Sequence, residues 1–490
     1  MGSIPVAPAT HEVYIPNLDM KIQRIKYANH PIMGDLSLSF TDESEKPYAT
    51  IVFAGENGTG KTTILRTIAS ICTKLEPHCE IECVLDESDK AKLAELGFTL
   101  AIRNDMITLK TEESRVGVAI VEYQLDTGPL KREIVWSKPQ GQGMNMVADY
   151  MSTVVAKFKT NNQEPNLQEV TSTTKLTVDE PHESERLLYA SHLNASELLV
   201  NINSQDAIEL QEKVRNGISV SEADAENRIT RFRTAFANFF DNQLSFLKVE
   251  NFKIWFSKGG KKFEINQLSS GEKTIVQYGA FFLKDLNANE TFISLIDEPE
   301  QSLHPRWEDK ILRYYKDVLT KNRQQLSQLF ITTHSEYTIK DAYEADDLII
   351  ILKRNVNGQI EATPSLKLDL FPSGPTYNEI KYSAFNLITP DFHSELFDYL
   401  HRTYLNQGQL TRETITEFDN LLAADTACPT TNGITPNIRG DKTLPTYIRN
   451  FIDHPSGVDN QNQRCRRKYT DDELKQSIEY LINRVKNLPR

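Results

Sequence analysis

The chain has 490 residues, enough for two or three domains with a large buried core, which excludes a peptide hormone or a disulfide-stapled miniprotein. Apolar residues make up 39% of it and charged residues 25%, so collagenous and disordered chains are excluded too. The net charge of −13 predicts repulsion of nucleic acid unless basic groups cluster locally. Residues 351–490 carry 17 basic and 17 acidic side chains, so the acidic excess lies in the first 350 residues. That asymmetry indicates different tasks for the two parts.

The sequence also bears on the compartment. The start, MGSIPVAPAT, lacks the charged and apolar regions of a secretory signal, and the apolar run at 348–352 is far shorter than the roughly 18 residues of a membrane span. The five cysteines form no CxxC pair, as is typical of free thiols in a reducing compartment. We therefore expect a cytoplasmic protein with no membrane partner.

The elements can be predicted in chain order. Alternating residues at 21–40 predict a meander of strands, ATIVFA at 49–54 predicts a buried strand, and short strands continue to about 136. Residues 156–186 predict a surface loop and 204–242 predict helix, before two strands around a turn at Gly259 and Gly260. A compact α/β stretch is expected from 268 to about 353. Pro, Gly and Ser at 372–375 mark a boundary, after which helices are expected at 394–405, 411–424, 444–453 and 471–486.

The segment GENGTGKT at residues 55–62 matches GxxxxGK[ST] and lies between a predicted strand and a predicted helix. Its glycines allow backbone N–H groups to wrap a phosphate, Lys61 can reach the β and γ phosphates, and the Thr62 hydroxyl can bind Mg²⁺. We predict a site for ATP and Mg²⁺ formed by Gly55, Glu56, Asn57, Gly58, Thr59, Gly60, Lys61, Thr62 and Thr63.

A second segment, TFISLIDEPE at 291–300, is an apolar strand that ends in two acids. Asp297 is predicted to hold Mg²⁺ from its second shell, and Glu298 is predicted to polarise the attacking water, as phosphoryl transfer requires. Adjacent acids after a strand are common in turns. The phosphate loop upstream makes this pair informative.

Three shorter segments extend the pattern. NQLSSGEKT at 266–274 resembles the signature motif of ABC-type ATPases, with Ser269 and Gly271 able to meet a phosphate at a helix N-terminus; alternatively, Ser269–Glu272 only caps that helix, and both can hold. QSLHP at 301–305 resembles the D-loop of the same proteins. In LFITTHS at 329–335 a predicted strand ends at His334, 36 residues after Glu298, which favours a γ-phosphate sensor over a structural histidine.

Over residues 20–353 these five elements together resemble the head of an ABC-type ATPase of the SMC-like or OLD-like branch. The resemblance implies an ATP-sandwich homodimer, in which Gly55–Thr62 of one subunit and Leu268–Glu272 of the other hold the same nucleotide. Gln124 is a candidate for the Q-loop. Asp297 follows Lys61 by 236 positions, too few for long coiled-coil arms, which excludes a chromosome-spanning SMC rod.

EPEQSLHP with TTHS most resembles the standalone AAA-type ATPases of bacterial antiphage systems. That resemblance implies that the ATPase senses infection and releases a toxic effector, which is either a separate protein or its own C-terminal domain. The expected fold is α/β: a P-loop ABC-type ATPase head at 1–353 with a lobe inserted at about 84–250, followed by a mainly α-helical domain at 371–490.

The segment YIRNFIDHP contains Arg449, Asn450 and His454, whose spacing resembles the RNase motif of HEPN domains. Helix positions i and i+5 lie about 140° apart, so a helix end at Pro455 would have to bring Arg449 and His454 together. The alternative is that these residues bond locally and cap a helix. The basic residues Arg464, Arg466, Arg467 and Lys468 predict a solvated loop or, if RNA is cut, a phosphate contact.

Several functions remain open at this stage. The chain is expected to be an ATPase, in homodimers or larger homo-oligomers, that regulates a separately encoded nuclease or toxin in antiviral defence. It is alternatively a metal-independent HEPN-like ribonuclease gated by ATP, a scaffold that cages a partner, or a DNA-repair-type SMC-like ATPase. Nucleic acid stays open as a partner.

Overall fold

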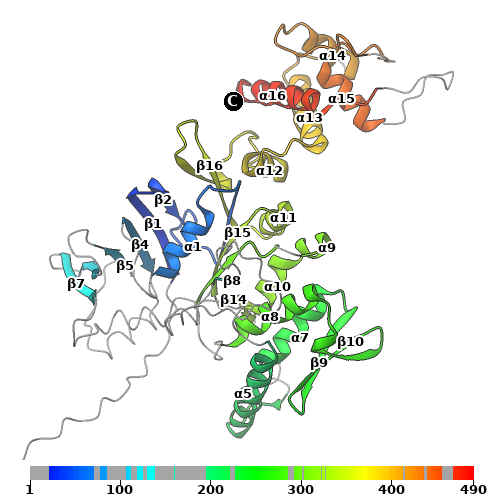
Figure 1. Ribbon diagram of the computed structural model, residues 1–490. Coiled ribbons are helices and arrows are strands. Elements are labelled where there is room, and N and C mark those ends of the chain that lie inside the picture. The colour runs from blue at the N-terminus through cyan, green and yellow to red at the C-terminus, as the bar shows by residue number, and fades with distance from the viewer. Residues whose placement is uncertain are drawn as a thin grey trace, which may run out of the picture. The chain divides into compact units, whose positions relative to one another are not determined.

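The computed structural model divides into two compact units, Met1–Ala362 and Thr363–Arg490 (Figure 1). The described residues are 21–70, 78–84, 106–111, 118–124, 130–137, 159–160, 195–220, 227–284, 292–300, 303–321, 323–325, 327–411, 414–434, 437, 439–454 and 467–489. Most of the loop predicted at 156–186 therefore lies outside the described residues, as do Pro455, Arg464 and Arg466.

A six-stranded sheet forms the centre of the first unit, in the order β17-β16-β3-β15-β12-β8. Its strands are β3 (Thr50–Gly55), β8 (Lys159–Thr160), β12 (Phe292–Asp297), β15 (Ser327–Thr333), β16 (Leu348–Arg354) and β17 (Ile360–Pro364). The five strands from β16 to β8 run parallel. Every residue of β3 and β15 is buried, as expected for parallel strands covered on both faces.

The order of this sheet determines where functional groups can meet. β15 lies between β3 and β12, with Thr333 opposite Ala54 and Thr332 opposite Asp297. Parallel strands present their carboxyl ends at one edge, and α1 (Lys61–Ser70) begins just after β3. Side chains at the ends of β3, β12 and β15 therefore lie close together.

A second six-stranded sheet is antiparallel and follows the order β2-β1-β4-β5-β6-β7. Its strands are β1 (Lys21–His30), β2 (Gly34–Ser39), β4 (Cys79–Val84), β5 (Met106–Thr111), β6 (Val118–Gln124) and β7 (Leu130–Ser137). The side-chain amide of Gln328 on β15 joins the two sheets, because it accepts from Ile22 N at 2.7 Å and donates to Ile22 O at 2.8 Å. Such a paired amide satisfies buried backbone groups where the layers meet.

The rest of the first unit is a smaller α/β lobe with helices beside the central sheet. Its strands are β9 (Leu244–Glu250), β10 (Lys253–Lys258) and β11 (Lys261–Glu264). The turn predicted at Gly259 and Gly260 joins β10 to β11, whereas β9 and β10 are joined at Asn251 and Phe252, which have positive φ. The helices are α5 (Ala195–Arg215), α7 (Arg228–Phe239), α8 (Ser270–Lys284), α9 (Pro305–Glu308), α10 (Ile311–Val318) and α11 (Glu336–Glu344). The edge of the Phe246 ring packs against Phe232 and Phe256, which supplies the lobe with a core of its own.

The second unit is helical, with α12 (Tyr377–Phe385), α13 (Pro390–Asn406), α14 (Ile415–Ala423), α15 (Leu444–Asp453) and α16 (Asp471–Lys486). Each helix begins at a threonine whose hydroxyl accepts a backbone N–H; these are Thr376, Thr389, Thr414, Thr443 and Thr470. Phe392, Phe397, Phe418 and Tyr447 are among the buried side chains of its core. Such a core has the size and apolar content to hold the helices together without a sheet.

The predicted fold class is confirmed: an α/β head with a parallel sheet behind the phosphate loop is followed by a helical unit. The helix predicted over 204–242 is wrong in its continuity, since α5 ends at Arg215 and α7 begins at Arg228. Asn227 caps the start of α7 by accepting the N–H of Ile229. Hydrophobic periodicity alone does not distinguish such a cap from a residue inside a helix. Among the described residues, no helix combines the length and apolarity of a membrane span.

Candidate nucleotide site

The loop from β3 to α1 is the candidate phosphate-binding loop. Gly58 and Gly60 have φ of 76° and 87°, values that side-chain-bearing residues rarely adopt. A Cβ at Gly55 would lie 2.3 Å from Leu352 O, and one at Gly60 would lie 2.6 Å from Met33 Sδ. Glycine is therefore required at 55 and 60 by close neighbours as well as by the backbone.

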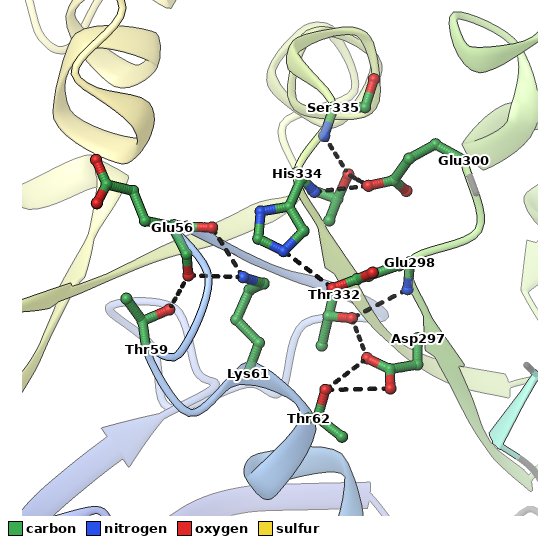
Figure 2. A network of polar contacts seen from close by, with 12 residues as sticks. Glu56, Thr59, Lys61, Thr62, Asp297, Glu298, Glu300, Thr332, His334 and Ser335 are labelled. Carbon is green, nitrogen blue, oxygen red and sulfur yellow. Dashed lines mark hydrogen bonds and ion pairs between the residues drawn. The ribbon is translucent and has the colours of Figure 1, made fainter. Parts of the chain in front are cut away.

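Lys61, the first residue of α1, is 4% exposed and points back into this loop (Figure 2). Its ammonium donates to Gly55 O at 2.8 Å and to Glu56 O at 3.0 Å. Burial lowers the pKa of Lys61 to about 8, although the carboxylates of Glu298 and Asp297 act to raise it. A buried ammonium bonded to two carbonyl oxygens can exchange these partners for an incoming anion.

Thr62 and Asp297 meet although they lie 235 positions apart. The Thr62 hydroxyl donates to both carboxylate oxygens of Asp297, at 3.1 and 3.2 Å. Thr332 at the end of β15 also donates to Asp297, at 2.5 Å, and fixes the carboxylate (Figure 2). A hydroxyl beside a buried carboxylate offers the hard oxygen atoms that Mg²⁺ prefers.

Glu298 follows Asp297 in a left-handed conformation with φ of 50°. Its N–H donates to Thr332 O at 3.0 Å, so the turn is anchored to the neighbouring strand. Its Oε1 atom lies 2.9 Å from Nε2 of His334, which follows β15 directly (Figure 2). The structure thus brings the predicted water-polarising acid and the predicted sensor histidine into contact.

Glu300 supports this contact from behind. It accepts the His334 N–H at 2.6 Å and the Thr333 hydroxyl at 2.8 Å. Burial raises the pKa of Glu300. Neither Glu300 nor Thr332 is predicted from the sequence to have a role, although both lie within the motifs DEPE and TTHS.

The predicted signature segment caps α8. Ser269 N–H donates to Glu272 Oε2 at 2.8 Å, and Ser269 Oγ accepts the Glu272 N–H at 3.4 Å, which is the capping box of the alternative interpretation. Ser269 is exposed, and its hydroxyl also bonds the Glu272 carboxylate. Although burial acts to raise the pKa of Glu272, hydrogen bonds from Lys258 and Ser269 lower it. A Cβ at Gly271 would lie 2.7 Å from the Trp307 ring, so the segment packs against α9.

The remaining head motifs are less informative. Gln301 and Ser302 of QSLHP lie outside the described residues, and His304 caps α9 by accepting the Arg306 N–H at 3.2 Å. Gln124 ends β6 in the antiparallel sheet.

In the helical unit, the Arg449 guanidinium lies 2.8 Å from Asp453 and donates to the Asn450 amide oxygen at 3.2 Å. Asn450 is 5% exposed and donates to Asp441 at 2.9 Å. His454 is the exposed residue at which α15 ends. The local hydrogen bonds of the alternative interpretation are therefore present.

A family model described as "AAA domain, putative AbiEii toxin, Type IV TA system" matches residues 166–340. The match includes Asp297, Glu298 and His334. The prediction of an ATPase is confirmed at the level of this AAA domain. No curated protein matches the chain.

Solved structures with a similar arrangement are SMC heads. The SMC head domain from Thermotoga maritima has a TM-score of 0.35 at 13% identity, over 70% of this chain and 98% of that one. The Smc head of Pyrococcus furiosus, with an extended coiled coil and bound to the C-terminal domain of ScpA, has a TM-score of 0.38 at 14% identity, over 70% and 96%. An SmcHead bound to the C-winged helix domain of ScpA has a TM-score of 0.40 at 14% identity, over 70% and 97%.

Proposed function

We propose that the cluster around Lys61 binds ATP with Mg²⁺ and hydrolyses it. The observation that carries this proposal is the convergence of Lys61, Thr62, Asp297, Glu298 and His334 at one edge of the sheet. Phosphoryl transfer needs such groups: an ammonium, a hydroxyl–carboxylate pair, and an acid in contact with a histidine. These residues come from three segments that lie far apart in the sequence: the start of α1, the end of β12 and the residue after β15.

The donor set fits the ligands. Phosphate oxygens would accept from the Lys61 ammonium and from the backbone N–H groups of Gly55–Thr62, with Glu56, Asn57, Thr59 and Thr63 completing the segment. Thr62 and Asp297 would hold Mg²⁺, which neutralises developing phosphate charge when bound. Binding of the triphosphate replaces the two carbonyls as partners of Lys61 and raises the pKa of its ammonium.

Glu298 is the group that would act on the attacking water. As an acceptor it would orient the water and take up its proton while the water oxygen bonds to the γ phosphorus and the bond from that phosphorus to the bridging oxygen of ADP breaks. His334 fixes the Glu298 carboxylate at 2.9 Å and, by exchanging this contact for a phosphate oxygen, would report the presence of the γ phosphate. Glu300 keeps His334 in position through its backbone N–H.

We further propose that two copies of the chain complete each site. Ser269 is exposed just before α8, where a second copy of the chain can reach it. Among the described residues, no hydrogen bond or ion pair joins Ser269–Glu272 to the phosphate loop of the same chain. This arrangement supports a sandwich in which Ser269 and Gly271 of one subunit approach the nucleotide of the other.

At the level of biology, we propose that nucleotide state gates a toxic effector in antiphage defence, with the ATPase cytoplasmic and the effector a separate nuclease or toxin. The match to a family described by a toxin–antitoxin system supports this role. The ribonuclease alternative receives no support from Asn450, whose amide is buried and used by Asp441.

A mixing experiment tests the two-copy site. Lys61→Ala and Ser269→Arg chains should each be inactive, since each lacks one half of the site. In a mixture, half of the dimers contain one of each chain and form one complete site, so turnover should recover to roughly a quarter of the wild-type value. If Lys61 and Ser269 serve the same site within one chain, turnover does not recover.

Phosphate release is the measurement. The control is a mixture of Lys61→Ala and Glu298→Gln chains, which must stay inactive because both changes affect the same half of each site.

A further inference from the structure

The hairpin β16–β17 contacts the phosphate loop at each of its three glycines. A Cβ at Gly55 would lie 2.3 Å from Leu352 O on β16, and a Cβ at Gly60 would lie 2.9 Å from the Ile360 side chain on β17. Arg354, at the end of β16, reaches the third: its Nη2 and Nε donate to Gly58 O at 2.6 and 3.0 Å. The hairpin therefore backs the loop along its whole length.

Arg354 is itself held within the hairpin. Its Nη1 donates to Gly358 O at 2.7 Å, and the turn is closed by Gly358 N donating to Asn355 O at 2.8 Å. The Asn355 side chain accepts the N–H groups of Asn357 and Gln359, both at 3.0 Å. A planar guanidinium bonded on two sides presents a fixed geometry to Gly58.

Peptide geometry gives this contact a consequence for ligand binding. In a trans peptide the C=O and the following N–H point in opposite directions. When Arg354 holds the Gly58 carbonyl on the hairpin side, the Thr59 N–H is turned to the opposite side. Gly58 and Gly60 have little intrinsic preference for one loop conformation, so an external contact must select it.

We propose that Arg354 is a positioning residue of the nucleotide site: it presets the Gly58–Thr59 peptide for phosphate and ties the phosphate loop to the turn that leads into β17. β17 spans Ile360–Pro364 and so crosses from the first unit into the second, which begins at Thr363. The hairpin thereby couples phosphate binding to the strand that leads to the helical unit. This inference rests on the proposed function of the loop.

The test compares wild type, Arg354→Ala, Arg354→Lys and the control Arg313→Ala, which removes an equal charge from the exposed surface of α10. The probes are fluorescent N-methylanthraniloyl-ATP with Mg²⁺ for binding and phosphate release for turnover. Arg354→Ala should raise Kd and KM about tenfold. Its kcat should stay within about twofold, since Glu298 and His334 are untouched. Arg354→Lys should recover part of the affinity, and Arg313→Ala should match wild type.

Hydrogen exchange of the amides at 359–363 tests the coupling in the whole chain. ATP should slow exchange there in wild type, and this slowing should shrink in Arg354→Ala. If Arg354→Ala keeps the wild-type Kd and the wild-type slowing of exchange by ATP, the inference about Arg354 is overturned while the proposed function of the loop stands. Equal losses of kcat and affinity, with a lowered Tm and no rescue by lysine, assign Arg354 to general stability and also overturn it. If wild type binds no nucleotide, the proposed function fails and this inference fails with it.

Discussion

The candidate nucleotide site and the Arg449–His454 cluster differ in how far along the chain their contacts reach. Thr62 and Asp297 bond across 235 positions, and Thr332 reaches Asp297 across 35. Arg449 pairs with Asp453 one turn further along the same helix. A local pair forms whenever the helix forms, whereas a distant convergence of polar groups has to be built by the fold. The distant cluster is therefore the stronger indication of a selected site.

The charges of the two clusters point the same way. Lys61 is buried, its pKa is lowered to about 8 by burial, and carbonyl oxygens hold its ammonium. Arg449 has a partly exposed carboxylate partner, as surface ion pairs commonly do. A buried cation is costly for the fold even with carboxylates nearby, and it is useful for an anionic ligand. The difference predicts catalysis in the head and structural roles in the cluster.

The largest effect is expected from Glu298→Gln, which removes the acceptor for the water proton. We expect kcat for ATP to fall by about 10²–10⁴ while Kd changes little, because phosphate binding uses other groups. Phosphate release and nucleotide titration measure the two quantities. Glu344→Gln, an exposed acid on α11, is the control. Normal turnover by Glu298→Gln would show that Glu298 does not accept the water proton, and it would weaken the contrast between the two clusters.

A smaller effect separates Asn450 from Arg449 in stability. Asn450→Ala leaves Asp441 without its buried donor and should lower the opening free energy of α15 by about 1–3 kcal/mol. Arg449→Ala removes a partly exposed ion pair and should lower it by less than about 1 kcal/mol. Hydrogen exchange of the α15 amides in the whole chain measures both. A larger loss from Arg449→Ala would reverse the assignment.

His393 provides a pH test of the helical unit. Burial lowers its pKa from 6.5 to about 3, and one ring nitrogen lies 2.9 Å from Ser477 Oγ. Between these values the unfolded chain binds a proton that the folded chain does not, so stability should fall as pH drops below 6.5. The slope from this group is at most about 1.4 kcal/mol per pH unit. Urea denaturation at pH 7.5 and 5.5 should show a shallower slope in His393→Gln; an unchanged slope contradicts the assignment.

The smallest expected effect is on RNA. If the Arg449 cluster is structural, wild type should leave RNA intact in EDTA with or without ATP. Gel analysis of a labelled RNA, with Arg449→Ala in parallel, makes the measurement. Cleavage that Arg449→Ala abolishes would establish the HEPN-like ribonuclease and erase the contrast between the two regions.

The sequence predicts best what is local. Gly55–Thr62 could be identified because phosphate chemistry constrains consecutive residues, and α15 and α16 begin and end where predicted. Arg354 could not be identified, since its partner Gly58 lies 296 positions away. The helix α12 was missed, because the Pro and Gly at 372–375 mark a boundary and hide the Thr376 cap that follows.

The central claim is that Gly55–Thr62 binds triphosphate through Lys61. Calorimetric titration of Mg²⁺–ATP into wild type and Lys61→Ala tests it most directly. Wild type should bind one nucleotide per chain, and Lys61→Ala should lose about 100-fold in affinity with no loss in Tm, because the change removes a buried charge. Equal affinity in the two proteins, or no binding by either, would contradict the account.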